Sequence, residues 1–533
     1  MSQTNETNGN EAEVVKCFGS RAYALLKKPG DFEPQECFYP RCLNAQIHPL
    51  VSSFFNLGNE RIILRYCHLN PSLHECLNYT PAHFRWAGSD LFNVTNAYGQ
   101  RQMIIVETNS CPSGQKSMPL LSDIDEHGGS VLYVFDRIFW LYILHTSFTG
   151  DIHYLQVQSF LFVESVFKMY HTVLSTAFQS SLSQSDPKLG GLAVIYDKNE
   201  MEAIGYATVM ADLTHEPVWM AEFYDGDPNP PVKWDKGILY VRDKDGKWHS
   251  IRACFRYVTK APWNRIPLKT QTLVLNKIVS CLAGGRNKMM AARAYELFNA
   301  EMSGTGLMIR TPETLTNISK SEIPLIVSSW GGNAVIKVPY SNAGQGVYIV
   351  TNHKELYEFM QIDHRYDKFV VQSLVGNASW SSVTREGIQY RNIPDKKGKT
   401  FVSDLRCMVA VGDMGGFRPV AIYARRARKP LLRKLEDDPL TTGWEMLGTN
   451  LSVKNRDGSF STESQRLVLM DRNLALGISL DDLIEGYVQT VLSVIAIDKL
   501  ATRLINSNTG EFDMELFRAL NPDDPLLEEI LHQ

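Results

Sequence analysis

The segment from Ala334 to Val350, AVIKVPYSNAGQGVYIV, constrains the fold more than any other part of the chain. Its β-branched residues predict one strand that ends near Lys337 and a second that begins near Gly346. Small residues fill the loop between them, so its backbone N–H groups can cradle a phosphate at which Lys337 also points. A P-loop is excluded, because that motif needs a following helix and Gly-Lys-Ser/Thr. An ordinary glycine hairpin remains the alternative for this motif alone.

A second motif, FRWAGSDLFNVTNAYGQRQMIIVETNSCPSG, carries acidic and amide oxygens. The β-branched run Gln102–Thr108 predicts a strand, and the period of two places Glu107 and Asn109 on one face. Asp90 lies in another strand-like segment. Hard oxygen ligands on adjacent strands suit magnesium bound together with a nucleotide. The alternative for Glu107 and Asn109 is that they cap a strand before a turn.

Together the two motifs resemble those of the ATP-grasp enzymes, in which a lysine strand and a glycine-rich hairpin close over ATP. The Glu-x-Asn pair precedes the lysine strand here, as in the circularly permuted branch that includes the eukaryotic glutathione synthetases. Two further segments fit that order, SIRACFRYV with Arg256 and CLAGGRNKMMAARAYELF with Lys288. The resemblance spans roughly residues 61–454 and rests on spaced motifs rather than on close similarity.

The resemblance implies an α/β fold, with an ATP-grasp domain, a smaller α/β substrate domain and a helical C-terminal appendage. The expected division begins with a disordered tail at 1–15, followed by the N-terminal part of the ATP-grasp domain at 16–185, which holds metal-binding strands and buried helices. The substrate domain follows at 186–275, the ATP-grasp domain proper at 276–465 and the C-terminal helices at 466–533. Hydrophobic periodicity also predicts helices at 131–178 (one or two), 200–213, 287–301, 354–361 and 480–505. Strands are expected at 192–196, 218–223, 237–241, 248–252, 368–374, 404–411 and 420–424.

The resemblance also assigns roles to individual residues. The ATP-binding residues would be Lys288, Lys337, Asn342, Gly344, Gln345, Gly346, Gln372, Ser373, Leu374 and Lys454. The metal ligands would be Asp90, Glu107 and Asn109. The catalytic residues would be Arg256, Glu107 and Arg425. The substrate would contact Arg85, Ser110, Ser113 and Arg256.

The sequence departs from the family pattern at four places. Gly88 stands where the family has a substrate arginine, and Ser341 or Asn342 stands where it has an acidic metal ligand. Ser452 replaces an arginine, and NRDGSFST after Lys454 replaces an alanine- and glycine-rich substrate loop. Most of these changes concern substrate recognition, so γ-glutamylcysteine is not the expected substrate. The missing loop acid predicts weaker magnesium binding.

Two polar clusters have simpler explanations. The run ARRARKPLLRK, which contains Arg425, follows a strand and fits a solvated basic edge, although one or two of its arginines can serve a phosphate. The cluster Cys67, His68, His74 and Cys76 matches no standard zinc spacing and is better explained by core thiols and surface histidines.

The composition argues against nucleic-acid binding, a membrane span and export. The 54 Lys and Arg against 58 Asp and Glu give a net charge of −4, which argues against a dedicated nucleic-acid binder. The most apolar stretch, 131–148, contains Asp136 and Arg137, so no membrane span is expected. The polar N-terminus predicts no export signal, and nine scattered cysteines fit reduced thiols in the cytoplasm.

The expected activity is an ATP- and Mg²⁺-dependent ligase that joins a small carboxylic acid to an amine through an acyl phosphate. Its partners would be these small molecules, with no nucleic acid or membrane, and the family also allows a homodimer. Two alternatives stay open: a phosphotransferase on the same fold, and a nucleotide-binding protein that has lost catalysis.

Overall fold

The structure is a computed structural model of the 533-residue chain. It describes residues 21–43, 45, 48–66, 71–118, 174, 178, 180–182, 184–258, 265–341, 346–411, 415–454, 460–468 and 476–531. Several predictions lie outside these residues: the tail at 1–15, most of the helical segment 131–178, the loop residues Asn342, Gly344 and Gln345, and the pair Cys67 and His68.

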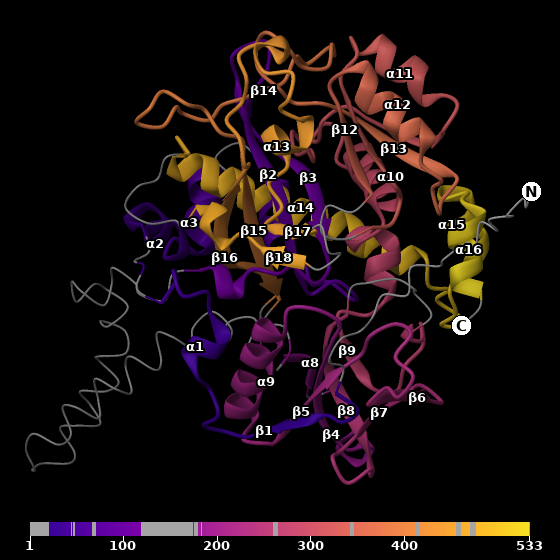
Figure 1. Cartoon of the computed structure of the whole chain (residues 1–533). Coiled ribbons are helices and arrows are strands. Elements are labelled where there is room, and N and C mark those ends of the chain that lie inside the picture. Colours follow the sequence, from indigo (N-terminus) through magenta and orange to yellow (C-terminus); the bar gives the residue numbers. More distant parts are fainter. Residues whose placement is uncertain are drawn as a thin grey trace, which may run out of the picture.

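A 7-stranded sheet forms the lower part of the molecule in Figure 1. Its order is β1-β5-β4-β8-β7-β6, with β9 added beside β8. The strands are β1 (Leu25–Lys27), β4 (Gly191–Tyr196), β5 (Val218–Glu222), β6 (Val232–Asp235), β7 (Ile238–Arg242), β8 (Trp248–Tyr257) and β9 (Leu273–Leu275). Strand β4 runs parallel to β5 and β8, and the helix α9 (Glu200–Thr214) connects β4 to β5. These correspond to the strand 192–196, the helix 200–213 and the strand 218–223 that the sequence predicted.

A 6-stranded antiparallel sheet forms the centre, in the order β14-β2-β15-β16-β19 with β3 beside β2. Its strands are β2 (Trp86–Thr95), β3 (Arg101–Asn109), β14 (Gln389–Tyr390), β15 (Ser403–Val411), β16 (Phe417–Arg426) and β19 (Leu467–Val468). Segments from both ends of the chain therefore share one sheet. The short helices α1 (Pro34–Cys37), α2 (Pro49–Phe55), α3 (Gly58–Tyr66) and α4 (Pro71–Leu77) precede it in the chain.

A 4-stranded sheet forms the upper right part in Figure 1, in the order β10-β13-β11-β12. Its strands are β10 (Thr314–Ser319), β11 (Ala334–Lys337), β12 (Val347–Val350) and β13 (Lys368–Ser373), with the helices α11 (Ile323–Ser329) and α12 (His353–Gln361) beside them. Strands β11 and β12 form the predicted antiparallel hairpin, in which Lys337 lies opposite Val347. Further short elements include α8 (Ser180–Leu182), α13 (Gly443–Leu447), β17 (Ser452–Lys454) and β18 (Phe460–Thr462).

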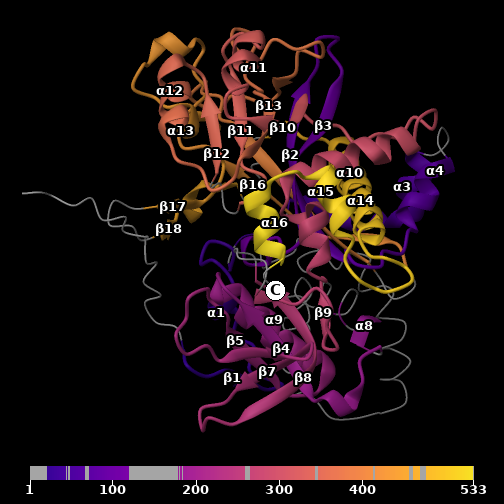
Figure 2. The same cartoon turned by 90° about the vertical axis from the view of Figure 1, so that its right-hand side faces the viewer.

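The helix α14 (Leu480–Arg503) is the centre of the core. It begins with a capping box in which Ser479 accepts a hydrogen bond from the N–H of Asp482, and its apolar residues are buried on nearly every side. It packs against β3, β15 and the helix α10 (Lys288–Glu301). The helices α15 (Met514–Leu520) and α16 (Asp524–Leu531) follow and lie beside α10 and β13 in both views (Figures 1 and 2).

The structure confirms the predicted α/β class and, within the described residues, the principal helices and strands. The predicted helix 287–301 corresponds to α10, and the predicted strand pair 404–411 and 420–424 corresponds to β15 and β16. The domain boundaries stay predictions. Strand β1 belongs to the lower sheet and β2 to the central one, so the segment 16–185 contributes to both.

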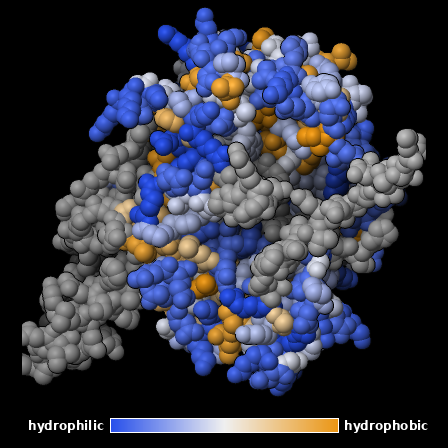
Figure 3. All heavy atoms as spheres, in the orientation of Figure 1, coloured by the Kyte–Doolittle hydropathy of each residue, from blue (hydrophilic) through white to orange (hydrophobic). Residues whose placement is uncertain are grey.

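On the face that Figure 3 shows, the described residues are mostly hydrophilic, with apolar residues scattered among them. Among the helices that the structure describes, none combines the length and apolar character needed to cross a membrane.

Candidate active site

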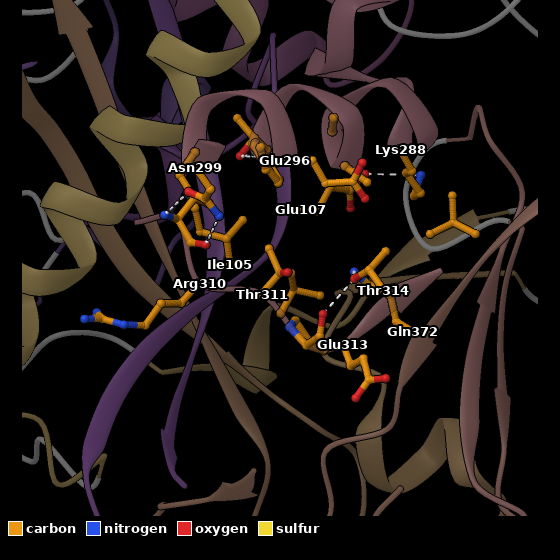
Figure 4. Close-up of a pocket in the computed structure, with 18 of the residues that line it drawn as sticks. Ile105, Glu107, Lys288, Glu296, Asn299, Arg310, Thr311, Glu313, Thr314 and Gln372 are labelled. Atoms are coloured by element: carbon orange, nitrogen blue, oxygen red, sulfur yellow. Dashed lines mark hydrogen bonds and ion pairs between the residues drawn. The ribbon is translucent and has the colours of Figure 1, made fainter. Parts of the chain in front are cut away.

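A cavity of about 510 Å³ opens where α10, β3, β11 and β13 meet. Four predicted site residues line it, one from each of these elements: Lys288, Glu107, Lys337 and Gln372. Figure 4 shows Glu107 and Lys288 facing each other on one side, with Glu313, Thr314 and Gln372 gathered on another. The structure therefore brings together residues that are up to 265 positions apart in sequence (372 − 107).

Lys288 is positioned by the start of its helix. Asn287 is the N-cap of α10, and its side-chain oxygen accepts hydrogen bonds from the N–H groups of Met289 and Met290, both at 3.1 Å. Lys288 is therefore the first helical residue. Its Nζ lies 3.3 Å from Glu107 Oε1 and donates to Ser341 Oγ at 2.9 Å.

A glycine allows the chain to turn into α10. Gly284 has φ of +146°, which side-chain-bearing residues rarely adopt. A Cβ there would lie 2.8 Å from Ile497 Cγ1 and 2.9 Å from the Ala291 Cα. Only glycine therefore allows this turn to pack so closely against α10 and α14.

Lys337 is almost completely buried, with 4% of its surface exposed. Its Nζ donates to the carbonyl of Val106 at 3.2 Å, and within the described chain it has no ion pair within 4.0 Å. Burial lowers the pKa of Lys337 to about 8, an effect that the nearby Glu107 opposes and Lys288 reinforces. A buried lysine with so few partners is suited to receive an anion.

Glu107 keeps its carboxylate ionised although it is only partly exposed. Burial raises its pKa, but Lys288, Lys337 and Arg286 together outweigh that effect, and the pKa is lowered overall. Arg286, which the motifs did not single out, also lines the cavity. It donates to Asn109 Oδ1 at 3.0 Å and to the Cys111 carbonyl at 2.9 Å, and its buried Nε has no partner among the residues that the structure describes.

Asp90 lies opposite Glu107 across β2 and β3, but it is bound by arginines. Arg406 donates to both carboxylate oxygens, at 2.6 and 2.7 Å, and Arg425 Nη2 lies 2.9 Å from Asp90 Oδ2. Arg425 also pairs with Asp404. Burial raises the pKa of Asp90, but the two arginines lower it far more.

The three predicted metal ligands therefore differ in what they can offer an ion. Asp90 is occupied by Arg406 and Arg425, and the Asn109 oxygen is occupied by Arg286. Among the described residues, no three His, Cys, Asp or Glu side chains lie close enough together to hold a metal. As arranged, the protein alone does not fit a magnesium site, and Glu107 is the carboxylate left to face one.

Three predicted substrate contacts meet instead around Asn276, which the sequence analysis missed. Its Oδ1 accepts from the N–H of Arg85 at 2.9 Å, its Nδ2 donates to the carbonyl of Ser110 at 2.7 Å, and its own carbonyl accepts from Arg256 Nε at 2.9 Å. Arg256 has 0% exposure and also donates to the carbonyl of Val258 at 2.7 Å. In this arrangement these groups tie the lower sheet to the central one.

Gly88 has no room for the arginine that the family pattern would place there. A Cβ at this position would lie 2.8 Å from Pro112 Cβ and 3.0 Å from Met408 Cγ. The packing around Gly88 thus agrees with the absence of the family's arginine from this position.

A second polar region lies at the carboxyl ends of β4 and β8. Lys198 follows β4, and its Nζ lies 5.9 Å from the centre of the Tyr257 ring at the end of β8. Asn199 donates to the Tyr257 hydroxyl at 3.1 Å and to Ser113 Oγ at 3.3 Å. Burial, together with the nearby Arg286, lowers the pKa of Lys198 to about 7.

The predicted adenine-binding strand is β13. Gln372 Nε2 donates to Thr314 Oγ1 at 2.9 Å, the N–H of Ser373 to the Glu313 carbonyl at 2.8 Å, and the N–H of Leu374 to Ser382 Oγ at 2.7 Å. The backbone N–H groups of Ser373 and Leu374 are thus already used. Lys454 lies at the end of β17, and Gly346 stands just before β12.

Neither a protein-family model nor a curated protein sequence matches the chain. Among solved structures it is similar to a glutathione synthetase-like effector from Globodera pallida, with 9% identity, a TM-score of 0.35, and coverage of 71% of this chain and 82% of that one. It is also similar to an ATP-grasp RimK domain protein from Sphaerobacter thermophilus, with 14% identity and a TM-score of 0.25, over 44% of this chain and 90% of that one.

A third similar structure is the D-alanine–D-alanine ligase of Helicobacter pylori, with 10% identity and a TM-score of 0.24, over 44% of this chain and 90% of that one. ATP-grasp proteins are among the solved structures to which the chain is similar.

Proposed function

We propose that this chain is an ATP-dependent ligase that joins a small carboxylic acid to an amine. The observation that carries the proposal is the cavity in which Lys288, Lys337 and Glu107 converge. Two buried ammonium groups beside a single carboxylate leave net positive charge for the phosphates of ATP. Such preorganised charge is what phosphoryl transfer needs, because its catalysis is mostly positioning and electrostatic stabilisation.

The proposed reaction has two steps. A carboxylate oxygen of the acid attacks the γ-phosphorus, the bond from that phosphorus to the bridging oxygen breaks, and an acyl phosphate and ADP result. The amine nitrogen then attacks the carbonyl carbon, the carbon–oxygen bond to phosphate breaks, and the nitrogen loses a proton. Lys288 and Lys337 would hold the phosphates in line with the acid. Of the predicted metal ligands, Glu107 would be the one to face a magnesium ion bound to the phosphates, and such an ion would supply neutralisation of their charge.

The acid would bind at the carboxyl ends of β4 and β8. Ligands of parallel sheets bind where the connections leave neighbouring strands in opposite directions. Here β4 leads to β5 on one side, while β8 leads to β9 on the other. Lys198 lies at this point without an ion pair among the described residues, and its charge would attract the carboxylate.

Melting curves with and without ATP and Mg²⁺ test the nucleotide site. Ligand at about 100 times its Kd should stabilise the fold by about 2.7 kcal/mol, and Lys337→Ala should lose that shift. Lys354→Ala, an exposed lysine on α12, is the matched control and should keep it. If the wild-type protein showed no shift, the assignment of the cavity to ATP would be wrong.

Screening small amino acids and peptides for ADP release, followed by product mass, tests the reaction class. An amide product with free phosphate supports the ligase. A phosphorylated product would establish the phosphotransferase instead, and ATP binding without ADP release would point to a protein that has lost catalysis.

A further inference from the structure

The C-terminal segment Asp513–Leu531, which comprises α15 and α16, connects two sides of the cavity. It returns from α14 through a hydrogen bond from the N–H of Asp513 to the carbonyl of Leu504 at 2.8 Å. Phe517, Leu526 and Ile530 are buried in the same core that contains α10 and α14. Figures 1 and 2 both place α15 and α16 beside α10 and β13. The segment is thus a packed part of the fold.

Its first polar contact reaches the start of α10. The side-chain oxygen of Asn521 accepts a hydrogen bond from Asn287 Nδ2 at 2.9 Å, and both residues have 0% exposure. The other end of the Asn287 amide caps the helix that Lys288 begins. Because an amide has one donor end and one acceptor end, Asn521 fixes the orientation in which Asn287 caps α10.

Its second contact reaches the start of β13. Asp523, also with 0% exposure, accepts hydrogen bonds from the N–H groups of Asp367 and Lys368, both at 2.9 Å. Strand β13 carries Gln372 of the cavity wall and pairs with β11, where Val370 lies opposite Lys337. Asp523 therefore fixes the strand beside the buried lysine.

A third contact lies near the end of α16. Glu529 Oε1 lies 2.6 Å from Arg365 Nη2 and accepts a hydrogen bond from the Tyr366 hydroxyl at 3.2 Å. Arg365 and Tyr366 directly precede the two N–H groups that Asp523 binds. The same approach to β13 is thus held from two places on the segment.

We propose that Asn521 and Asp523 are positioning residues, which set the spacing between Lys288 on α10 and Lys337 beside β13. The inference rests on the proposed nucleotide site, since the spacing matters because both ammonium groups would contact one triphosphate. Only one residue, Pro522, separates Asn521 from Asp523, so α10 and β13 are held at a nearly fixed distance. Loosening either contact lets the two lysines part.

The experiment compares Asn521→Ala and Asp523→Ala with Arg518→Ala, an exposed residue of α15. Isothermal titration with ATP and Mg²⁺ should give a Kd about 10-fold higher for the first two variants, because one hydrogen bond typically contributes about that factor. The control should keep the wild-type Kd.

The variant Asn521→Asp retains the oxygen that accepts the hydrogen bond from Asn287. It loses no other side-chain hydrogen bond, because Asn521 Nδ2 has no partner within the described chain. This variant should therefore bind ATP more tightly than Asn521→Ala.

Hydrogen exchange without nucleotide separates this inference from the proposed function. Exchange should quicken at Met289 and Met290 in Asn521→Ala, and at Asp367 and Lys368 in Asp523→Ala, because these amides lose fixed partners. If the wild-type protein failed to bind ATP, the proposed function would be wrong. The exchange rates of these four amides would still show whether Asn521 and Asp523 hold α10 and β13. Wild-type exchange and wild-type Kd in both alanine variants would overturn the inference. If one alanine variant does not fold, the other still decides the inference, because each contact holds its own pair of amides.

Discussion

Two carboxylates, Glu107 and Asp90, lie opposite each other on neighbouring strands and meet different surroundings. The Glu107 side chain is 25% exposed, lines the cavity and faces Lys288. The Asp90 side chain is 9% exposed and is held by the guanidinium groups of Arg406 and Arg425. Both pKa values are lowered in spite of burial, one mainly by lysines and the other by arginines.

The difference teaches how one sheet face can serve both architecture and chemistry. The planar fork of Arg406 matches a carboxylate and engages both of its oxygens. An ammonium group is a point charge that can also attract a ligand, and Lys337 keeps no ion pair among the described residues. We therefore expect mutations at Asp90 to affect stability and mutations around Glu107 to affect binding and rate.

The largest effect is expected for Asp90→Asn. Removing the charge leaves Arg406 and Arg425 buried with less compensation, which should lower the free energy of unfolding by about 3–5 kcal/mol. Urea unfolding near neutral pH measures it, and Glu107→Gln is the matched control, with a much smaller loss. A small loss of stability combined with loss of magnesium-dependent ATP binding would instead make Asp90 a metal ligand.

The stability that Asp90 contributes should also depend on pH in the acid range. Because the folded pKa of Asp90 is depressed, its stabilisation is present above the unfolded value of about 3.9 and is lost as the pH falls toward the folded pKa. The wild-type protein should therefore lose its advantage over Asp90→Asn in acid. A constant difference in unfolding free energy from neutral pH to pH of about 2 would contradict this.

Lys337→Ala should come next in size. The variant should fold normally and bind ATP about 10- to 100-fold more weakly, the usual range for a hydrogen bond to a charged group. Isothermal titration gives the Kd, and Lys354→Ala should leave it unchanged. Equal Kd values for wild type and Lys337→Ala would remove this lysine from the site.

Glu107→Gln should lower kcat about 10-fold while changing the Kd for ATP less. The carboxylate pairs with Lys288 and would also face a metal ion bound to the phosphates. Its negative charge should therefore affect the transfer of the phosphoryl group more than the binding of ATP. Single-turnover ADP release alongside ATP titration separates the two quantities. A change in Kd alone would make Glu107 a binding residue only.

The smallest effect is a pH dependence of ATP affinity. Lys337 has a pKa of about 8 and is charged below it, so the affinity should fall as the pH rises through about 8. The charged groups that surround it are Glu107, Lys288 and Asp90. Lys337→Arg stays charged throughout and should flatten the profile. An identical pH profile for both proteins would assign the dependence to another group.

Part of the candidate site was predictable because its signals are local. The β-branched residues around Lys337 and the period of two at Glu107 and Asn109 predict strands, and the structure confirms β11 and β3. The cap before Lys288 is likewise local, since Asn287 binds N–H groups two and three residues ahead. The assignment of these residues to ATP stays a prediction.

Other parts of the site depended on contacts that no local pattern reveals. Nothing near Asp90 in sequence shows that Arg406, 316 positions away, occupies its carboxylate. Arg256 lies on a strand as expected, yet whether it faces a ligand or backbone carbonyls depends on how β8 packs against Asn276. Arg286 and Asn276 were missed for the same reason.

The sequence by itself determined the principal helices and strands and the hairpin of the described chain, because periodicity, caps and turn residues act within a few positions. Tertiary structure alone decided which charges were satisfied and which stayed open to a ligand. That outcome depends on strand register and on distant segments meeting, as when Asn521 reaches Asn287 across 234 positions. The electrostatic balance of a buried group is set by its neighbours in space, and those neighbours exist only in the folded chain.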